Sequence, residues 1–219
     1  MKTPFSLAFA TIAAFFATNA GVAADITWTG TPLTASSTSI RTDGTLKYAY
    51  ARGNYTANGV AFVGVGDKII NTANCVVWEA SSGAREGQSN PPEDTEDGGY
   101  KNLLLYGWWA NTNPNPKPRK IQLNNLEDGK RYLVQIIAYR NITETLSAAV
   151  TAPDGGTTVK FVGDGWTYGS SLSAEFTAET ATEEFTLSYS NHCVINAIQV
   201  RELPADGPVS SRGLFFICK

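Results

Sequence analysis

The most constraining feature of this 219-residue sequence is a recurrence of short apolar or alternating runs separated by turn residues. The runs have the length of β-strands, and turn signals such as Asn58-Gly59 and Asp128-Gly129 lie between them. No segment carries a convincing helical period, so the pattern predicts an all-β fold of about eleven strands, with helix below about a tenth of the residues. The predicted strands are Ile26 to Trp28, Leu46 to Ala51, Val60 to Val65, Cys75 to Trp78, Asn102 to Trp109, Lys120 to Leu123, Tyr132 to Tyr139, Thr158 to Val162, Ser173 to Thr177, Glu184 to Tyr189 and Val194 to Val200.

Two of these runs indicate how the strands are layered. From Glu184 to Tyr189, apolar and polar residues alternate, so one face belongs to a core and the other to solvent. From Tyr132 to Tyr139 the run is apolar on both sides, which suits a central strand covered by a second sheet. We therefore expect a two-sheet antiparallel sandwich.

The N-terminus indicates export. Lys2 supplies a positive start, Leu7 to Ala17 is an uncharged apolar run, and Val22-Ala23-Ala24 supplies the small residues that precede a cleavage site. A transmembrane interpretation is the weaker alternative, because the run of about 11 residues falls short of the roughly 20 that a spanning helix needs. We expect a signal peptide at residues 1–24, one β-sandwich domain at 25–203 and a tail at 204–219, in a secreted or cell-surface protein with no transmembrane segment after cleavage.

The charge balance argues against a nucleic-acid partner. Removal of the signal leaves 16 basic and 20 acidic residues. Phosphate binding needs clustered basic side chains, and only Lys117, Arg119 and Lys120 lie close together.

The three cysteines are Cys75, Cys193 and Cys218. In an oxidising compartment, Cys75 and Cys193 are the better pair for a disulfide, because both lie in strand-like runs that two sheets could bring together. The alternative is that each is a small buried apolar group. No Cys/His cluster with the spacing of a zinc site is present in the sequence.

Three segments resemble the galactose-binding-like jelly rolls, which include malectin-like domains and many carbohydrate-binding modules. They are Leu103-Leu104 before a loop, the stretch from Ile121 to Gln135, and Ile195 to Val200. The N-terminal pieces 43–50 and 58–62 are similar to uncharacterised domains of secreted bacterial proteins. The resemblance implies a jelly-roll sandwich that binds sugar through aromatics and an Asn or Asp in apical loops, one of which precedes the last strand. Here that loop contains Asn191 and His192.

Aromatic residues near loops are the strongest candidates for a sugar site. A flat ring stacks on the apolar face of a pyranose while neighbouring polar groups bond its hydroxyls. Trp108 and Trp109, with Tyr106, precede an Asn-Pro loop at 111–118, and Trp166 and Tyr168 form a second candidate platform. Because adjacent strand residues face opposite sides, one Trp of the pair is expected in the core and the other at the surface, with burial of both as the alternative.

The long polar segment from Glu79 to Tyr100 carries an acidic cluster that offers oxygen ligands for Ca²⁺. Asp94, Glu96 and Asp97 are the candidate ligands, but their spacing matches no EF-hand and favours a solvated loop. No other cofactor is indicated. Asn196 shares its parity with Ile198 and Val200, so we expect it to point inward and bond backbone groups.

Catalysis has little support in the sequence. There is one histidine, and no Gly-x-Ser-x-Gly, His-Glu-x-x-His or phosphate loop is present. We therefore expect a non-catalytic carbohydrate-binding module for a polysaccharide or cell-surface glycan. A structural or adhesive domain without a small-molecule site is the first alternative, and a glycoside hydrolase is the second.

Overall fold

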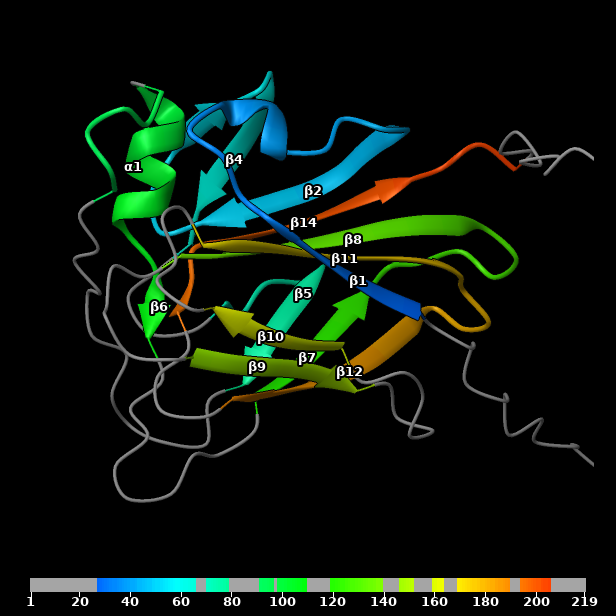
Figure 1. The fold of residues 1–219 in the computed structure, drawn as a ribbon. Helices are drawn as coiled ribbons and strands as arrows, with labels where there is room; N and C mark the ends of the chain where they lie inside the picture. Colours follow the sequence, from blue (N-terminus) through cyan, green and yellow to red (C-terminus); the bar gives the residue numbers. More distant parts are fainter. Residues whose placement is uncertain are drawn as a thin grey trace, which may run out of the picture.

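The fold consists of two stacked β-sheets with a small helical cap at one end (Figure 1). In the computed structural model, the residues that the structure describes are 27–65, 70–78, 91–96, 98–109, 119–139, 146–151, 159–163, 169–189 and 194–205. No helix within these ranges is long and apolar enough to cross a membrane.

The larger sheet has seven strands. In spatial order they are β1 (Thr27–Pro32), β11 (Ser170–Thr177), β8 (Arg131–Ala138), β14 (Ala197–Glu202), β2 (Thr45–Ala51), β4 (Val60–Gly64) and β3 (Tyr55–Ala57). Neighbouring strands are antiparallel except β2 and β4, which are parallel. Asn58 and Gly59, both at positive φ, close the β3–β4 hairpin, as expected for an Asn-Gly turn.

The smaller sheet has five antiparallel strands. Their order is β10 (Val159–Gly163), β9 (Leu146–Thr151), β12 (Thr182–Tyr189), β7 (Arg119–Asn124) and β5 (Cys75–Trp78). The main core fills the space between the two sheets, and its buried members include Trp28, Val134, Leu172, Phe185 and Ile198. The two-sheet antiparallel sandwich expected from the sequence is therefore confirmed.

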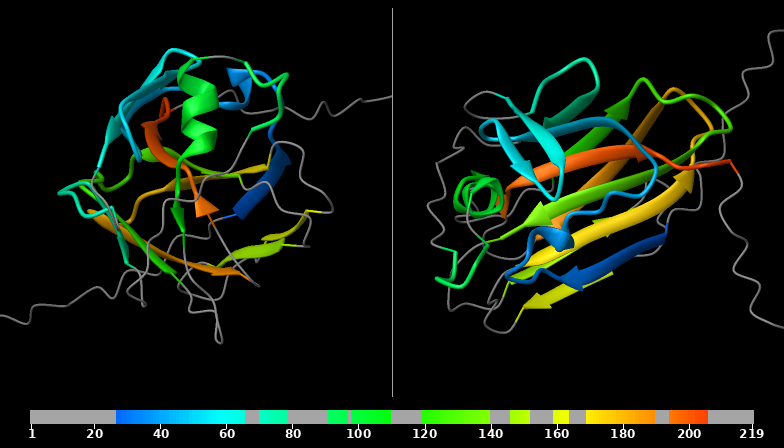
Figure 2. Two further views of the ribbon diagram at one scale, coloured as in Figure 1. Left: turned by 90° about the vertical axis from the view of Figure 1, so that its left-hand side faces the viewer. Right: turned by 90° about the horizontal axis from the view of Figure 1, so that it is seen from above.

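A second, smaller core covers part of the outer face of the larger sheet. Ile137 and Tyr139, from β8 and the residue after it, pack here with side chains of the β3–β4 hairpin and of the helix α1 (Gly99–Leu105). Figure 2 shows α1 at one end of the sandwich. Gly99 allows this helix to lie directly against the backbone of Thr56 in β3, where any side chain would collide. The apolar character of β8 on both sides is explained by these two cores.

One predicted strand is wrong. The run from Asn102 to Trp109 is split into the end of α1 and the two-residue strand β6 (Trp108–Trp109), which pairs with β13 (Val194–Ile195) in a separate ribbon. Tyr100, Leu103 and Leu104 are buried on one face of α1. Their i, i+3, i+4 spacing is typical of an amphipathic helix, so this segment forms a helix although its local run of apolar residues resembles a strand. The strands β3 and β9 were absent from the prediction.

Candidate functional site

A polar cleft lies on the outer face of the seven-stranded sheet, beside the part that the second core covers. Its volume is about 450 Å³. Of the nine described residues that line it, eight carry a polar side chain, and the ninth is alanine. The lining residues are Thr29, Thr31, Ser39, Arg41, Gln135, Ser171, Ser173, Ala174 and Glu175.

Sheet register places the polar side chains in rows. Thr29 of β1 is opposite Ser173 of β11, which is opposite Gln135 of β8, which is opposite Gln199 of β14. Residues opposite one another share a face of the sheet, so these four side chains lie side by side across four strands. In the next row Thr31 is opposite Ser171. Strand alternation and register thus build the floor of the cleft.

Gln135 is the buried centre of this floor. Its Nε2 donates to the Ser39 carbonyl at 2.9 Å and to Ser171 Oγ at 2.7 Å. Its Oε1 accepts from the Arg41 backbone N–H at 3.0 Å and from Gln199 Nε2 at 2.6 Å. A buried amide with all these partners is held in one orientation, so it fixes both the cleft floor and the segment above it.

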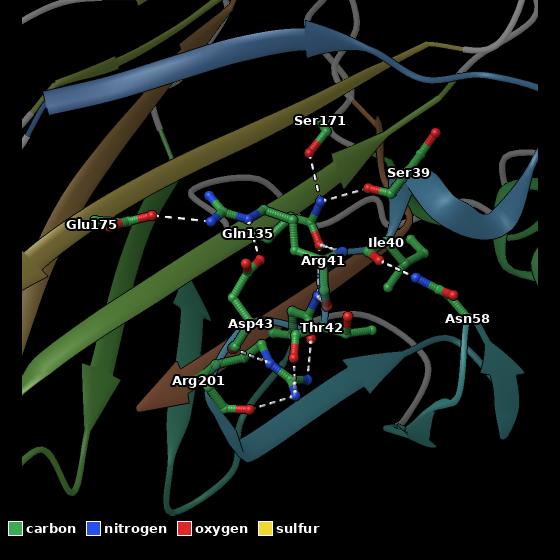
Figure 3. Close-up of polar contacts among 12 residues, drawn as sticks. Ser39, Ile40, Arg41, Thr42, Asp43, Asn58, Gln135, Ser171, Glu175 and Arg201 are labelled. Carbon is green, nitrogen blue, oxygen red and sulfur yellow. Dashed lines mark hydrogen bonds and ion pairs between the residues drawn. The ribbon is translucent and has the colours of Figure 1, made fainter. Parts of the chain in front are cut away.

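That segment, residues 39–44, is held to the sheet through six consecutive backbone carbonyls. Side chains donate to each of them: Gln135 to Ser39, Asn58 to Ile40, Gln199 to Arg41, and Arg201 to Thr42, Asp43 and Gly44 (Figure 3). The Arg201 side chain is buried, and desolvation lowers its pKa. We call residues 39–44 with Asn58, Gln135, Gln199 and Arg201 the polar clamp.

The clamp presents the Arg41 side chain at the rim of the cleft. Arg41 Nε donates to Asp43 Oδ2 at 2.8 Å, and Nη2 donates to Glu175 Oε1 at 3.0 Å. Desolvation opposes the charge of Arg41, but the bonds to the two carboxylates outweigh it and raise the pKa of the guanidinium. The second oxygen of Glu175 accepts from Arg131 Nη2 at 3.3 Å. Figure 3 shows Arg41 reaching from the clamp toward Glu175.

The cleft therefore offers hydroxyls that both donate and accept, an arginine that donates and a carboxylate that accepts. These hydrogen-bonding groups lie on strands of the sheet or on the clamped segment 39–44. Both parts of the protein are already ordered before a ligand binds. Such a surface suits a small polar ligand with many hydrogen-bonding groups.

The described aromatic residues that were predicted to bind sugar do not line the cleft. Trp108 is 2% exposed and belongs to the main core, so its assignment as a ligand-binding residue is wrong. Trp108 pairs with Ile195 of β13, and both residues belong to the main core. Tyr106 is half-buried and stacks on Tyr55, with ring centroids 6.4 Å apart.

Several predicted residues lie outside the part of the chain described. These are Trp166, Tyr168, Asn191, His192 and the side chain of Trp109. Their proposed role in binding stays a prediction.

In the acidic cluster, Glu96 caps a short helical turn, which is not the role of a calcium ligand that the sequence suggested. Glu96 accepts from the Ser37 backbone N–H at 2.6 Å and from Ser36 Oγ at 3.3 Å, at the start of the 3₁₀ turn η1 (Ser37–Ser39). The backbone bond is the main reason that the pKa of Glu96 is lowered. Asp94 is exposed, and Asp97 lies outside the described residues. Within the described ranges, no group of three or more acidic, His or Cys residues is arranged to hold a metal ion.

Cys75 is a buried free thiol, so the predicted bridge to Cys193 is not formed in this structure. Cys75 begins β5 at the edge of the five-stranded sheet, whereas the strand after Cys193, β13, joins β6 in the separate ribbon. Cys193 itself lies outside the described residues. Burial raises the pKa of the Cys75 thiol to about 12, so it remains protonated and unreactive.

Asn196 has the structural role expected of it. Its Oδ1 accepts from the Tyr139 N–H at 2.6 Å, and its Nδ2 donates to the carbonyls of Leu104 and Tyr106 at 2.9 and 3.1 Å. It joins α1 and its following turn to the end of β8, which confirms the inward orientation.

Neither the cleft nor the polar clamp was predicted from the sequence. A signal was present in β11, where Ser171, Ser173 and Glu175 alternate with the buried Leu172 and Ala174. Gln135 was hidden within a run that is otherwise apolar on both sides. Their convergence depends on register between strands that are far apart in sequence, which no local pattern contains.

No family model and no curated protein sequence matches this chain. Among solved structures, it is similar to a Bacteroides uniformis β-glucuronidase 2 covalently bound to cyclophellitol-6-carboxylate aziridine, at TM-score 0.49 and 12% identity, over 72% of this chain and 18% of that one. It is also similar to the GH115 4-O-methyl-α-glucuronidase BtGH115A, which has specificity for decorated arabinogalactans, at TM-score 0.35 and 9% identity, over 67% of this chain and 20% of that one. The chain thus spans about a fifth of the length of either protein. At these TM-scores, the similarities carry no argument about function.

Proposed function

We propose that this protein is an exported, non-catalytic carbohydrate-binding domain whose sugar lies in the polar cleft. The observation that carries the proposal is the cleft itself: eight polar side chains converge on one preorganised surface of the larger sheet. The proposal agrees with the resemblance of the sequence to galactose-binding-like jelly rolls, although it moves the site from the apical aromatics to the sheet face.

Sugars match the chemistry of this lining. Each sugar hydroxyl both donates and accepts, and Thr29, Thr31 and Ser173 do the same. The volume of about 450 Å³ falls within the range of small-molecule sites, which is about 300–1,000 Å³. An apolar ligand would displace water from these polar groups and leave them without partners, which costs affinity.

The small number of carboxylates in the cleft favours a binding role over hydrolysis. A glycosidase of the usual kind needs two carboxyl groups that flank the scissile bond. Among the described residues that line the cleft one carries a carboxylate, Glu175, and both of its oxygens are bonded to arginines.

The test is a variant that fills the cleft. Thr31 is an exposed residue of the edge strand β1 and lines the cleft, so Thr31→Trp places a bulky ring in the ligand space without disturbing the core. Thr56→Trp is the matched control, because Thr56 is an exposed threonine on β3, the strand at the opposite edge of the same sheet. Binding is measured by affinity electrophoresis in gels that contain single soluble polysaccharides.

We expect at least one polysaccharide to retard the parent protein and Thr56→Trp equally, and to leave Thr31→Trp unretarded. Equal melting temperatures for the three proteins would show that the fold is retained. Binding that survives in Thr31→Trp would place the site elsewhere. A parent protein that no polysaccharide retards would favour the structural role.

A further inference from the structure

We infer that the cleft selects neutral sugars over sugars that carry carboxylate or sulfate groups. The inference rests on the proposed function and specifies the class of carbohydrate that the site takes. It follows from how the charged groups at the rim of the cleft are paired.

The cleft lining holds one cation and one anion, Arg41 and Glu175, which are bonded to each other. Asp43 and Arg131 flank this pair, each on one partner, so the described rim has two cations and two anions in a continuous chain. The nearby Arg201 adds no free donor for a ligand, because it is buried beneath residues 42–44 and bonds their carbonyls.

Arg41 keeps some capacity for a ligand. Its Nε and Nη2 donate to Asp43 and Glu175, whereas Nη1 donates no hydrogen bond within the described part of the chain. The side chains of Arg41 and Glu175 are 33% and 41% exposed, so a ligand in the cleft can reach both.

A sugar hydroxyl fits this arrangement better than an anion does. It can accept from Arg41 Nη1 and donate its own proton to a Glu175 oxygen, and two neighbouring hydroxyls can divide these bonds between them. A carboxylate or sulfate can only accept. Because Asp43 and Glu175 already balance the charge of Arg41, an anion gains no net attraction from the rim and meets the negative charge of Glu175 in the cleft. The cleft is therefore expected to bind a group that both donates and accepts more tightly than a negatively charged group.

Removal of one rim carboxylate tests the inference. Glu175→Gln leaves the side-chain size unchanged and gives the rim a net positive charge. Glu184→Gln is the control, because Glu184 is a partly exposed carboxylate that pairs with Lys120 at 2.6 Å on the other sheet, away from the cleft. Affinity electrophoresis compares neutral galactomannan, xyloglucan and β-glucan with polygalacturonate, alginate and dextran sulfate at physiological salt.

We expect the parent protein and Glu184→Gln to bind one or more neutral polysaccharides and to bind the acidic ones more weakly. Glu175→Gln should shift the ratio of acidic to neutral binding by about threefold or more toward the acidic polymers, which is the size of effect expected for a solvent-accessible charge. Asp43→Asn, a second variant of the same rim, should shift the ratio in the same direction.

Two results would overturn the inference while leaving the proposed function in place: a parent protein that prefers acidic polysaccharides, or an unchanged ratio in both Glu175→Gln and Asp43→Asn. Failure of the proposed function gives a different pattern, in which the parent protein binds none of the six polymers or still binds them with Trp at position 31.

Discussion

The two faces of the seven-stranded sheet are built from the same strands and yet are stabilised in different ways. On the inner face, Ile136, Leu172 and Ile198 are buried in the main core, where stabilisation comes from removing apolar surface from water. On the outer face, their neighbours Gln135, Ser171 and Gln199 are equally buried but are hydrogen-bonded to one another or to residues 39–44. This sheet therefore uses its apolar inner face for stability, and it uses the part of its outer face beside the second core to shape a polar cleft.

The largest effect should come from the inner face. Ile136→Ala removes a fully buried side chain from the centre of β8 and leaves a cavity between the sheets. We expect the free energy of unfolding to fall by about 2–5 kcal/mol, measured by urea denaturation. A loss below about 1 kcal/mol would show that the two sheets are not packed as described.

A smaller effect should come from the polar clamp on the outer face. Arg201→Met keeps the apolar stem but removes the donors to the carbonyls of Thr42, Asp43 and Gly44. We expect a loss of about 1–3 kcal/mol and faster hydrogen exchange of backbone amides at 41–44, because partly buried acceptors that lose their partners are costly.

The matched control for the clamp is Arg131→Met. Arg131 is partly exposed and makes an ion pair with Glu175, so its loss should cost less than about 1 kcal/mol. If the two arginine variants were equally stable, the clamp would contribute nothing beyond a surface ion pair.

The difference between the faces also explains what could be predicted from sequence. The inner face follows from local alternation, and so the sandwich, the central position of β8 and the inward Asn196 were all predicted correctly. The clamp depends on Gln135 meeting residues 39–44, and the cleft depends on β1 pairing with β11, with more than 130 residues between them in the chain. Such contacts are products of the assembled fold.

The aromatic candidates for the sugar site also show that a local sequence pattern does not determine which side chains are buried. The pair Trp108–Trp109 satisfied the composition of a sugar platform, but Trp108 pairs with Ile195 of β13 and is buried with it in the main core. The helix itself was missed because Asn102 to Trp109 has the length and apolar content of a strand. Period and composition alone do not decide between these structures.

The smallest predicted effect concerns pH. The hydrogen bond from Arg41 is the main cause of the lowered pKa of Asp43. A carboxyl group whose pKa is lower in the folded protein stabilises it above the unfolded pKa, near 3.8, and loses this contribution as pH falls through the folded value. Because the Asp43 side chain is 54% exposed, solvent screening keeps the effect below about 1 kcal/mol.

Asp43→Asn should therefore reduce the loss of stability between about pH 5 and pH 2, measured by urea denaturation across that range. High salt should shrink the difference between the two proteins, because it screens the ion pair. Identical pH profiles at low salt would show that the Arg41–Asp43 pair does not persist in solution.

The most direct test of the central claim, that the outer-face cleft binds carbohydrate, is a backbone amide NMR titration. The isotopically labelled protein is titrated with an oligosaccharide cut from whichever neutral polysaccharide retards it most. We predict that the largest and saturable shift changes fall on β1, on Ser171 to Glu175 of β11 and on Ser39 to Arg41. Shift changes confined to residues around Trp109, Trp166 or His192, with β1 and β11 unmoved, would contradict the account and return the site to the apical aromatics.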